Sequence, residues 1–168
     1  AFSHMAAMVD DVDESLNLII RTGDTARFIA SVECTQELRV GTREGMAFPT
    51  HLVTGGLVLL AQLNSEQVES LYSMDRFSDR LDQRPDLQRL HRDLQRIRMQ
   101  GFAVTQGLAE IGVVAIGVPV RNRVGVAIAG LSMSMPSVRF DSVNIPAWVA
   151  ALRATAHAIE LEISGTGP

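Results

Sequence analysis

The sequence predicts an α+β fold, in which helices pack against one mainly antiparallel sheet. Two pairs of apolar segments are each joined by a short turn, and such hairpins pair their strands antiparallel. Several other segments place apolar residues three and four positions apart, as amphipathic helices do. Strands and helices do not alternate regularly, which disfavours a doubly wound parallel sheet.

The composition is that of one globular domain. The chain has 168 residues, a net charge of −4 and 46% hydrophobic residues, and a domain of ~150 residues buries about 70% of its unfolded surface. Its longest apolar runs, such as residues 113–120, are shorter than the ~20 residues that span a bilayer. The single cysteine, Cys34, and the lack of a secretory signal pattern predict a cytoplasmic protein with no membrane partner. The mild acidity argues against direct binding of a nucleic-acid backbone.

Residues 1–5 are expected to be a cloning remnant, because they contain Ser3-His4-Met5. The chain would then be cut from a longer protein, and its domain would occupy residues 6–164. A short acidic helix is expected over residues 5–14.

The next segment predicts a hairpin and a third strand. Apolar residues alternate over residues 16–21 and 26–32, on either side of a glycine-containing turn. After a polar break, residues 38–42 are expected to form the third strand. Residues 43–50, which contain Gly45 and Pro49, are expected to form a loop.

A helix is predicted to begin near Thr50 or His51, where apolar residues start to recur at helical intervals. It contains Gly55-Gly56, and each glycine costs about 1 kcal/mol relative to alanine inside a helix. Two explanations remain open. The glycines allow either a tight contact between the helix and the sheet, or access of an anion to the amides near the helix N-terminus.

Two further helices follow. Asn64 and Gln67 have capping-box spacing and predict a helix start, and the polar residues 74–84 are expected to form a surface loop. A third helix begins after Pro85-Asp86 and ends at Gly101. Its apolar stripe consists of Leu87, Leu90, Leu94 and Ile97.

The C-terminal part predicts a second hairpin and a last helix. Residues 113–120 and 124–134 are two apolar strands around a short polar turn, and a helix is expected over residues 147–163. Ser132 and Ser134 are two positions apart on a strand, so both hydroxyls face one side. They could donate hydrogen bonds to a carboxylate or a carbonyl, or they could be solvated at the strand end.

The sequence predicts no catalytic residue, no metal site and no cofactor. The four histidines have no i, i+4 spacing, which argues against a zinc site. Phosphate-binding and nucleophile-elbow motifs are absent. Cys34 has no base beside it in the sequence, and its place at the end of a predicted strand is typical of a small core residue.

Several pieces of sequence, taken in order, match a known pattern. They are Leu38-Arg39-Val40, Phe48-Pro49-Thr50-His51 after Gly45, and the segment 54–61, which reads TGGLVLLA. Arg98-Met99-Gln100-Gly101-Phe102-Ala103-Val104, Ile111-Gly112-Val113 and the Ser-x-Ser stretch of residues 129–136 follow. This ordered set resembles the effector-binding domain of IclR-type transcriptional regulators over essentially the whole chain. The resemblance implies a GAF-like fold, which agrees with the predicted α+β class.

The resemblance also implies a ligand site. In that family a small molecule, often a carboxylate or an aromatic acid, lies between the sheet and the glycine-bearing helix start. By motif, polar contacts would fall on Thr54, Gly55, Thr105, Ser132 and Ser134. Apolar walls would come from Val40, Phe48, Val113 and Ala115.

This sequence departs from the family pattern at three places. Leu57 replaces the motif's lysine, Thr105 replaces an acidic residue, and residues 112–115 lack the family's arginine and cysteine. The site is therefore less polar than in regulators that bind small oxo acids. We expect a larger or more apolar effector, such as an aromatic acid, with its polar end near Ser132, Ser134 and the amides around Gly55.

The function that the resemblance implies is ligand-controlled transcription. Family members bind operator DNA through an N-terminal winged helix-turn-helix domain, and no such segment is recognisable in these residues. The chain is therefore expected to be the sensor half of a regulator, working as a homo-dimer or tetramer. One alternative is a GAF-type sensory module of another signalling protein. A second is a small enzyme that uses Cys34 or His51, although no nucleophile–base pair is apparent.

Overall fold

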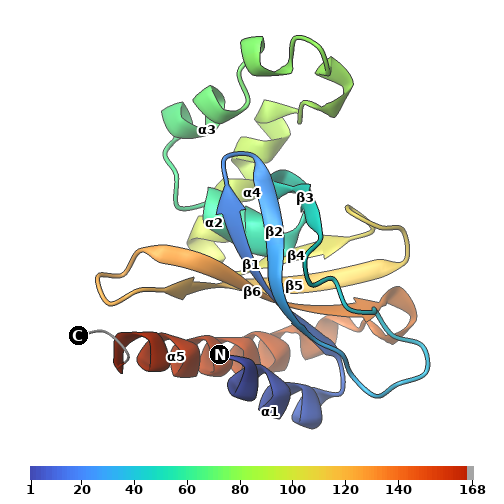
Figure 1. The fold of residues 1–168 in the computed structure, drawn as a ribbon. Helices are drawn as coiled ribbons and strands as arrows, with labels where there is room; N and C mark the ends of the chain where they lie inside the picture. The colour runs from blue at the N-terminus through green and yellow to red at the C-terminus, as the bar shows by residue number, and fades with distance from the viewer. Residues whose placement is uncertain (166–168) are drawn as a thin grey trace.

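The computed structural model describes residues 1–165 and contains a six-stranded antiparallel sheet (Figure 1). The spatial order of the strands is β3-β2-β1-β6-β5-β4. Their bounds are Ser15–Thr22 for β1, Thr25–Val32 for β2, Ala47–Pro49 for β3, Ala103–Gln106 for β4, Val113–Arg121 for β5 and Ala127–Pro136 for β6. The predicted α+β class is confirmed.

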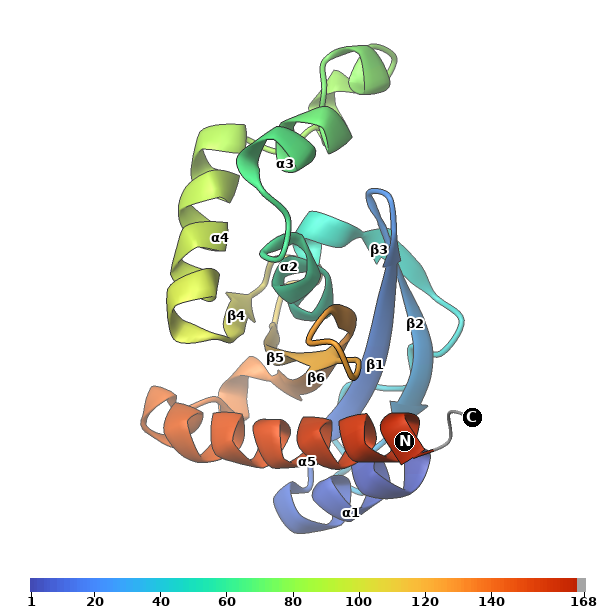
Figure 2. The ribbon, with the colours of Figure 1, turned by 90° about the vertical axis from the view of Figure 1, so that its left-hand side faces the viewer.

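Helices cover both faces of this sheet. They are α1 (Phe2–Val12), α2 (Thr54–Leu60), α3 (Ser65–Leu71), α4 (Leu87–Gln100) and α5 (Ile145–Gly165). Helices α1 and α5 lie side by side along one face, whereas α2 lies on the opposite face with α3 and α4 outside it (Figure 2). Within residues 1–165, no helix is both long and apolar enough to cross a membrane.

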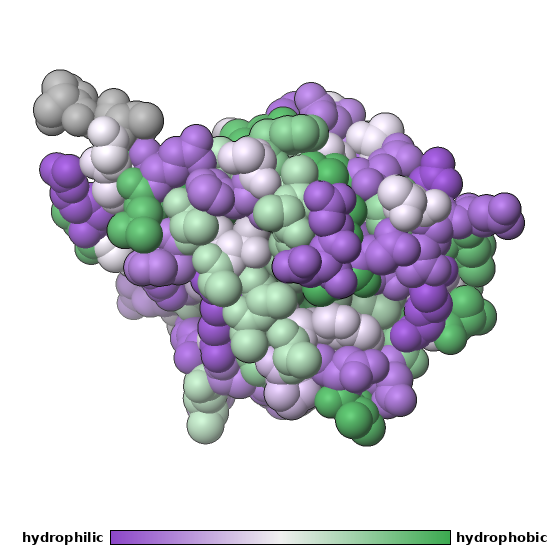
Figure 3. Space-filling view, turned by 90° about the horizontal axis from the view of Figure 1, so that it is seen from below, coloured by the Kyte–Doolittle hydropathy of each residue, from purple (hydrophilic) through white to green (hydrophobic). Residues whose placement is uncertain are grey.

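Each layer has its own hydrophobic core. The core under α1 and α5 includes Met5, Leu16, Ile116, Leu131, Met133 and Leu152. A second core joins α2, α3 and α4 through Leu60, Val68, Tyr72, Leu94 and Ile97. The outer surface of the α1 and α5 layer mixes apolar and polar side chains (Figure 3), and its exposed apolar residues include Phe2 and Leu161.

Both predicted hairpins and two predicted helix ends are confirmed. Strands β1 and β2 pair around the turn at Gly23, and β5 pairs with β6 along nearly their whole length. Asn64 and Gln67 form the capping box at the start of α3. Gly101 ends α4 with a φ of 80°, a left-handed conformation that glycine adopts at little cost.

The strand predicted over residues 38–42 is wrong. The third strand, which pairs with β2 on the side away from β1, is β3, and it falls inside the segment predicted as a loop. The backbone of residues 38–42 bonds to side chains rather than to a neighbouring strand. Ser15 Oγ donates to the Val40 carbonyl at 2.8 Å, Arg139 donates to the Leu38 carbonyl at 2.5 Å, and the Thr42 amide donates to Glu33 at 2.8 Å.

Two helix starts also differ from the prediction. Residues 50–52 form a 3₁₀ turn, and α2 begins only at Thr54 because Val53 is extended, with φ −123° and ψ 143°. Helix α1 begins at Phe2, three residues before the predicted start. Residues 2–5, expected to be a cloning remnant, lie in this helix, and Met5 is fully buried in the core.

Glycines allow α2 to lie directly on the sheet. A Cβ atom at Gly130 of β6 would lie 2.5 Å from the Cα of Gly55, and one at Gly55 would lie 2.5 Å from Ile19 Cδ1. On β5, a Cβ atom at Gly117 would lie 2.9 Å from the Thr54 side chain. A Cβ atom at Gly56 would overlap the carbonyl oxygen of Thr50 in the preceding 3₁₀ turn. Of the two explanations for Gly55-Gly56, the structure supports tight packing, against the sheet at Gly55 and against the 3₁₀ turn at Gly56.

Candidate effector site

A small cavity lies where the start of α2 meets the ends of β5 and β6. Its volume is about 20 Å³, which is room for about one water-sized molecule. The β4–β5 loop and the segment before β3 close its sides. The lining residues are Phe28, Arg43, Leu52, Val53, Thr54, Thr105, Ala109, Glu110, Val113, Ala115, Ser132 and Ser134.

Six of the nine site residues expected from the sequence line this cavity. They are Thr54, Thr105, Val113, Ala115, Ser132 and Ser134. The other three lie next to it. Val40 lines a groove on the outer side, the Phe48 ring lies 5.4 Å from the Arg43 guanidinium, and Gly55 is packed against Gly130 and Ile19.

Ser134 of β6 belongs to a series of hydrogen bonds across three strands. Asn17 on β1 donates to Ser134 Oγ at 3.5 Å and accepts from Ser31 Oγ on β2 at 2.6 Å. Ser31 Oγ also accepts from the Arg43 amide at 3.2 Å. This series of hydrogen bonds therefore connects Ser134, which lines the cavity, to the backbone of Arg43.

Thr54 lines the cavity and has an unpaired hydroxyl. Within residues 1–165 its Oγ1 atom is buried and has no hydrogen-bond partner. Thr54 is the first residue of α2, and the N-cap residue before it is Val53, whose side chain makes no capping bond. A buried hydroxyl without a partner costs about 1–3 kcal/mol, so a bound molecule that hydrogen-bonds Thr54 would recover part of that cost.

Arg43 and Glu110 are the two charged residues of the cavity lining, and neither is among the site residues expected from the sequence. Arg43 Nη2 lies 3.1 Å from Glu110 Oε2, and the Arg43 side chain is only 7% exposed. The guanidinium lies 5.8 Å from the centre of the Phe28 ring and 5.4 Å from that of Phe48. These are cation–π distances, so aromatic faces and one carboxylate hold the guanidinium in place.

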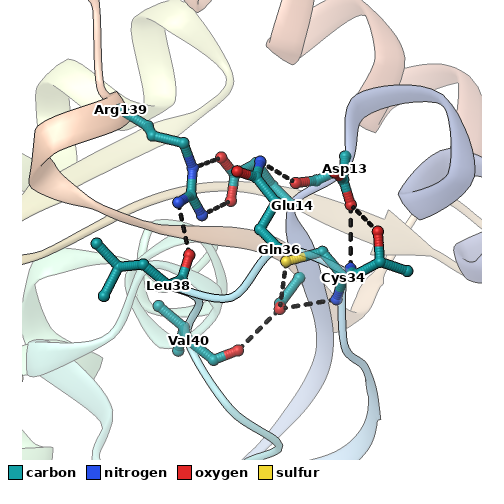
Figure 4. Close-up of polar contacts among 9 residues, drawn as sticks. Asp13, Glu14, Cys34, Gln36, Leu38, Val40 and Arg139 are labelled. Atoms are coloured by element: carbon teal, nitrogen blue, oxygen red, sulfur yellow. Dashed lines mark hydrogen bonds and ion pairs between the residues drawn. The ribbon is translucent and has the colours of Figure 1, made fainter.

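A separate polar cluster anchors the chain that leads to Val40 (Figure 4). Arg139 forms a bidentate ion pair with Glu14, with N···O distances of 2.6 and 2.9 Å, and also donates a hydrogen bond to the Leu38 carbonyl. Cys34 is buried in this cluster, where Ser15 Oγ lies 3.7 Å from its Sγ atom. These contacts fix the segment that precedes Arg43.

His51 lies apart from that cluster, against Tyr72. The centres of the two rings are 5.7 Å apart and their planes are nearly perpendicular. Burial lowers the pKa of His51, and the charge of Asp24 opposes this effect. Burial also raises the pKa of Tyr72 above its ordinary value. Cys34 and His51 thus have different polar neighbours, and within residues 1–165 no three His, Cys, Asp or Glu side chains form a candidate metal site.

Comparisons with known proteins agree on one family. The model of the bacterial transcriptional regulator IclR C-terminal region matches residues 1–161. The transcriptional regulator KdgR of Dickeya chrysanthemi is 33% identical over 147 residues, which are 87% of this chain and 48% of KdgR. The transcriptional repressor AllR of Escherichia coli is 28% identical over 149 residues, 87% of this chain and 54% of AllR.

The solved structures support the same fold. The crystal structure of the C-terminal domain of E. coli KdgR superposes with a TM-score of 0.80 and 25% identity, covering 96% of this chain and 94% of that one. The chain spans about half the length of the curated relatives that it matches. Those relatives are transcriptional regulators, not enzymes. The chain belongs to the family of IclR C-terminal domains, the GAF-like regulatory domains of bacterial transcriptional regulators.

Proposed function

We propose that this domain senses a small organic effector and thereby controls DNA binding by its regulator. The effector binds at the cavity between α2 and β6, and operator DNA is bound in the cytoplasm by a separate N-terminal domain. The domain works as a homo-dimer or tetramer, so that subunit contacts carry the change. The effector must bind two arrangements of the protein with different affinity, because equal binding shifts no equilibrium.

The observation that carries this proposal is the set of polar groups around the cavity. Thr54 contributes a hydroxyl without a partner, Ser132 and Ser134 contribute hydroxyls from one strand face, and Arg43 contributes a positive charge. Carbon-rich side chains, including those of Phe28, Val113 and Ala115, form the rest of the lining. A few convergent polar groups in an otherwise apolar lining are typical of small-molecule sites.

A thermal-shift screen tests the proposal. Ligands that bind only the folded chain stabilise it by about 2.7 kcal/mol at a concentration of 100 Kd. We expect one or more organic acids in a metabolite panel, with aromatic acids among them, to raise the unfolding temperature. The double variant Ser132→Ala, Ser134→Ala should lose this shift, whereas Ser137→Ala, on the turn after β6, should keep it.

A gel-shift assay of the full-length regulator on its operator then completes the test. The same acid is expected to change operator affinity. Absence of any stabilising compound, or shifts that the double serine variant leaves unchanged, would rule out the assigned cavity.

A further inference from the structure

Arg43 and Glu110 lie between the small cavity and a larger surface groove. The groove has a volume of about 340 Å³ and is lined by residues 38–43 together with parts of the β4–β5 loop. Arg43, Glu110 and Val113 line both spaces. Their ion pair is therefore part of the wall that separates the groove from the cavity.

The two partners are held very differently. The guanidinium of Arg43 is buried against two aromatic rings, and the Arg43 amide is bonded to Ser31. The Glu110 side chain is 47% exposed and lies on a loop between Gly107 and Gly112, both of which have positive φ. Arg43 is thus a fixed cation, and Glu110 reaches it from an exposed loop.

A buried guanidinium requires an anion beside it, because an isolated buried charge is strongly unfavourable. In the described part of the chain, that anion is Glu110. A second carboxylate could take its place without leaving Arg43 unpaired. A neutral molecule could not, because it would remove Glu110 and supply no charge.

We propose that Arg43 binds the carboxylate of a small organic acid and that Glu110 is its internal competitor. The acid enters from the groove and replaces the Glu110 carboxylate on Arg43. The released loop of residues 107–112 moves outward, and the groove and the cavity become one space. This inference rests on the proposed function, because it concerns the same cavity.

The size of the two spaces supports this route. The cavity of about 20 Å³ is too small for an aromatic acid, whereas the adjoining groove of about 340 Å³ is of the size of a small-ligand site. The body of the acid would lie towards Ser134 and the unpaired Thr54 hydroxyl. Arg43 therefore selects for acids, and Glu110 sets the concentration at which they bind.

Isothermal titration of the 168-residue chain tests the competition. The probes are benzoate and pyruvate, each compared with its neutral amide, benzamide and pyruvamide. We expect Glu110→Gln to bind at least one of the acids about tenfold more tightly than the unmodified chain, with no gain for the amide. Glu44→Gln is the matched control, because it removes the same charge from an exposed residue next to Arg43 in the sequence.

Variants of Arg43 complete the titration. Arg43→Met in the Glu110→Gln background should lose the preference for acid over amide. If this variant does not fold, Arg43→Lys keeps the charge but loses the planar, stacked geometry, and it should bind the acids several-fold more weakly. Undiminished acid preference in a folded Arg43 variant would overturn the inference.

Hydrogen exchange supplies a readout that needs no ligand. Amides of residues 107–112 should exchange faster in Glu110→Gln than in Glu44→Gln, because the ion pair that holds the loop is gone. Unchanged exchange would overturn the inference. So would equal affinity of an acid for Glu110→Gln and the unmodified chain, although ligand binding itself would stand. If none of the screened acids binds either chain, the proposed function fails.

Discussion

Strand β6 separates two sides of the molecule that differ in kind. Its residues Leu131, Met133 and Met135 face α1 and α5 and are fully buried in an apolar core. The alternate residues Gly130 and Ser132 face α2. Because side chains on a strand alternate between faces, one ten-residue segment contributes to a packed core on one side and to the cavity lining on the other.

The two sides also differ in how completely their buried polar side chains are hydrogen-bonded. Within residues 1–165, five residues bury a side-chain nitrogen or oxygen that has no hydrogen-bond partner: Thr50, His51, Thr54, Tyr72 and His91. Of these, His91 Nε2 lies 3.5 Å from a carboxylate oxygen of Glu69. All five lie on the α2 side of the sheet: in the 3₁₀ turn before α2, in α2, directly after α3, or in α4. On the other side the buried hydroxyl of Thr155 donates to the Ala151 carbonyl at 3.0 Å. The buried polar groups that lack a partner are therefore on the α2 side, and one of them, Thr54, belongs to a residue that lines the cavity.

The largest expected effect comes from the packed side. Leu131→Ala should lower the free energy of unfolding by about 2–5 kcal/mol, because it removes buried methyl groups and leaves an empty space in the core. Ser132→Ala, one residue later on the other face, should change it by less than about 1 kcal/mol. Urea unfolding followed by circular dichroism measures both. Equal losses would contradict the division of β6 into a core face and a cavity face.

Close packing of α2 on the sheet gives the next effect. Gly130→Ala should cost about 1–3 kcal/mol, because its Cβ atom would lie 2.5 Å from the backbone of Gly55. Gly41→Ala is the control, since no atom lies within 4 Å of a Cβ at that position. The same urea experiment measures both variants. A harmless Gly130→Ala would show that α2 can lift away from β6.

A smaller effect, of opposite sign, is expected at the cavity. Thr54→Val replaces the unpaired hydroxyl by a methyl group of the same shape and should stabilise the chain by about 1 kcal/mol. It should also weaken effector binding. Thr155→Val on the other side removes a paired hydroxyl and should destabilise the chain by about 1 kcal/mol. If both variants shift stability in the same direction, the hydroxyls of Thr54 and Thr155 do not differ in hydrogen bonding as the structure indicates.

Local patterns were sufficient for the two hairpins and for the two serines that line the cavity. The hairpins, the stripe of α4 and the period-two spacing of Ser132 and Ser134 depend on neighbours in the sequence, and each appears in the structure as predicted. The family resemblance added Thr54, Thr105, Val113 and Ala115, which also line the cavity.

Arg43 and the course of residues 38–42 could not be found in this way. The backbone of that segment is bonded by Ser15, Glu33 and Arg139, the last of which lies about a hundred residues away in the chain. Burial of Arg43 likewise depends on Phe28, Phe48 and Glu110, which come from three different segments. An arginine at the start of a predicted loop has no local pattern that would indicate burial.

The smallest expected effect concerns pH and again belongs to the α2 side. Burial lowers the pKa of His51, so the folded chain favours the neutral imidazole. Above the ordinary histidine pKa of about 6.5, His51 is neutral in both states and adds no pH dependence. Below that value the unfolded chain binds a proton that the folded chain does not, so stability falls as the pH falls towards the lowered pKa and then levels off.

Urea unfolding between pH 8 and 5 should show this pH dependence of stability in the unmodified chain and a weaker one in His51→Gln. His157→Gln, exposed on α5, should retain the pH dependence; if instead it removes the pH dependence and His51→Gln does not, the pH-sensitive group lies on the packed side of the sheet.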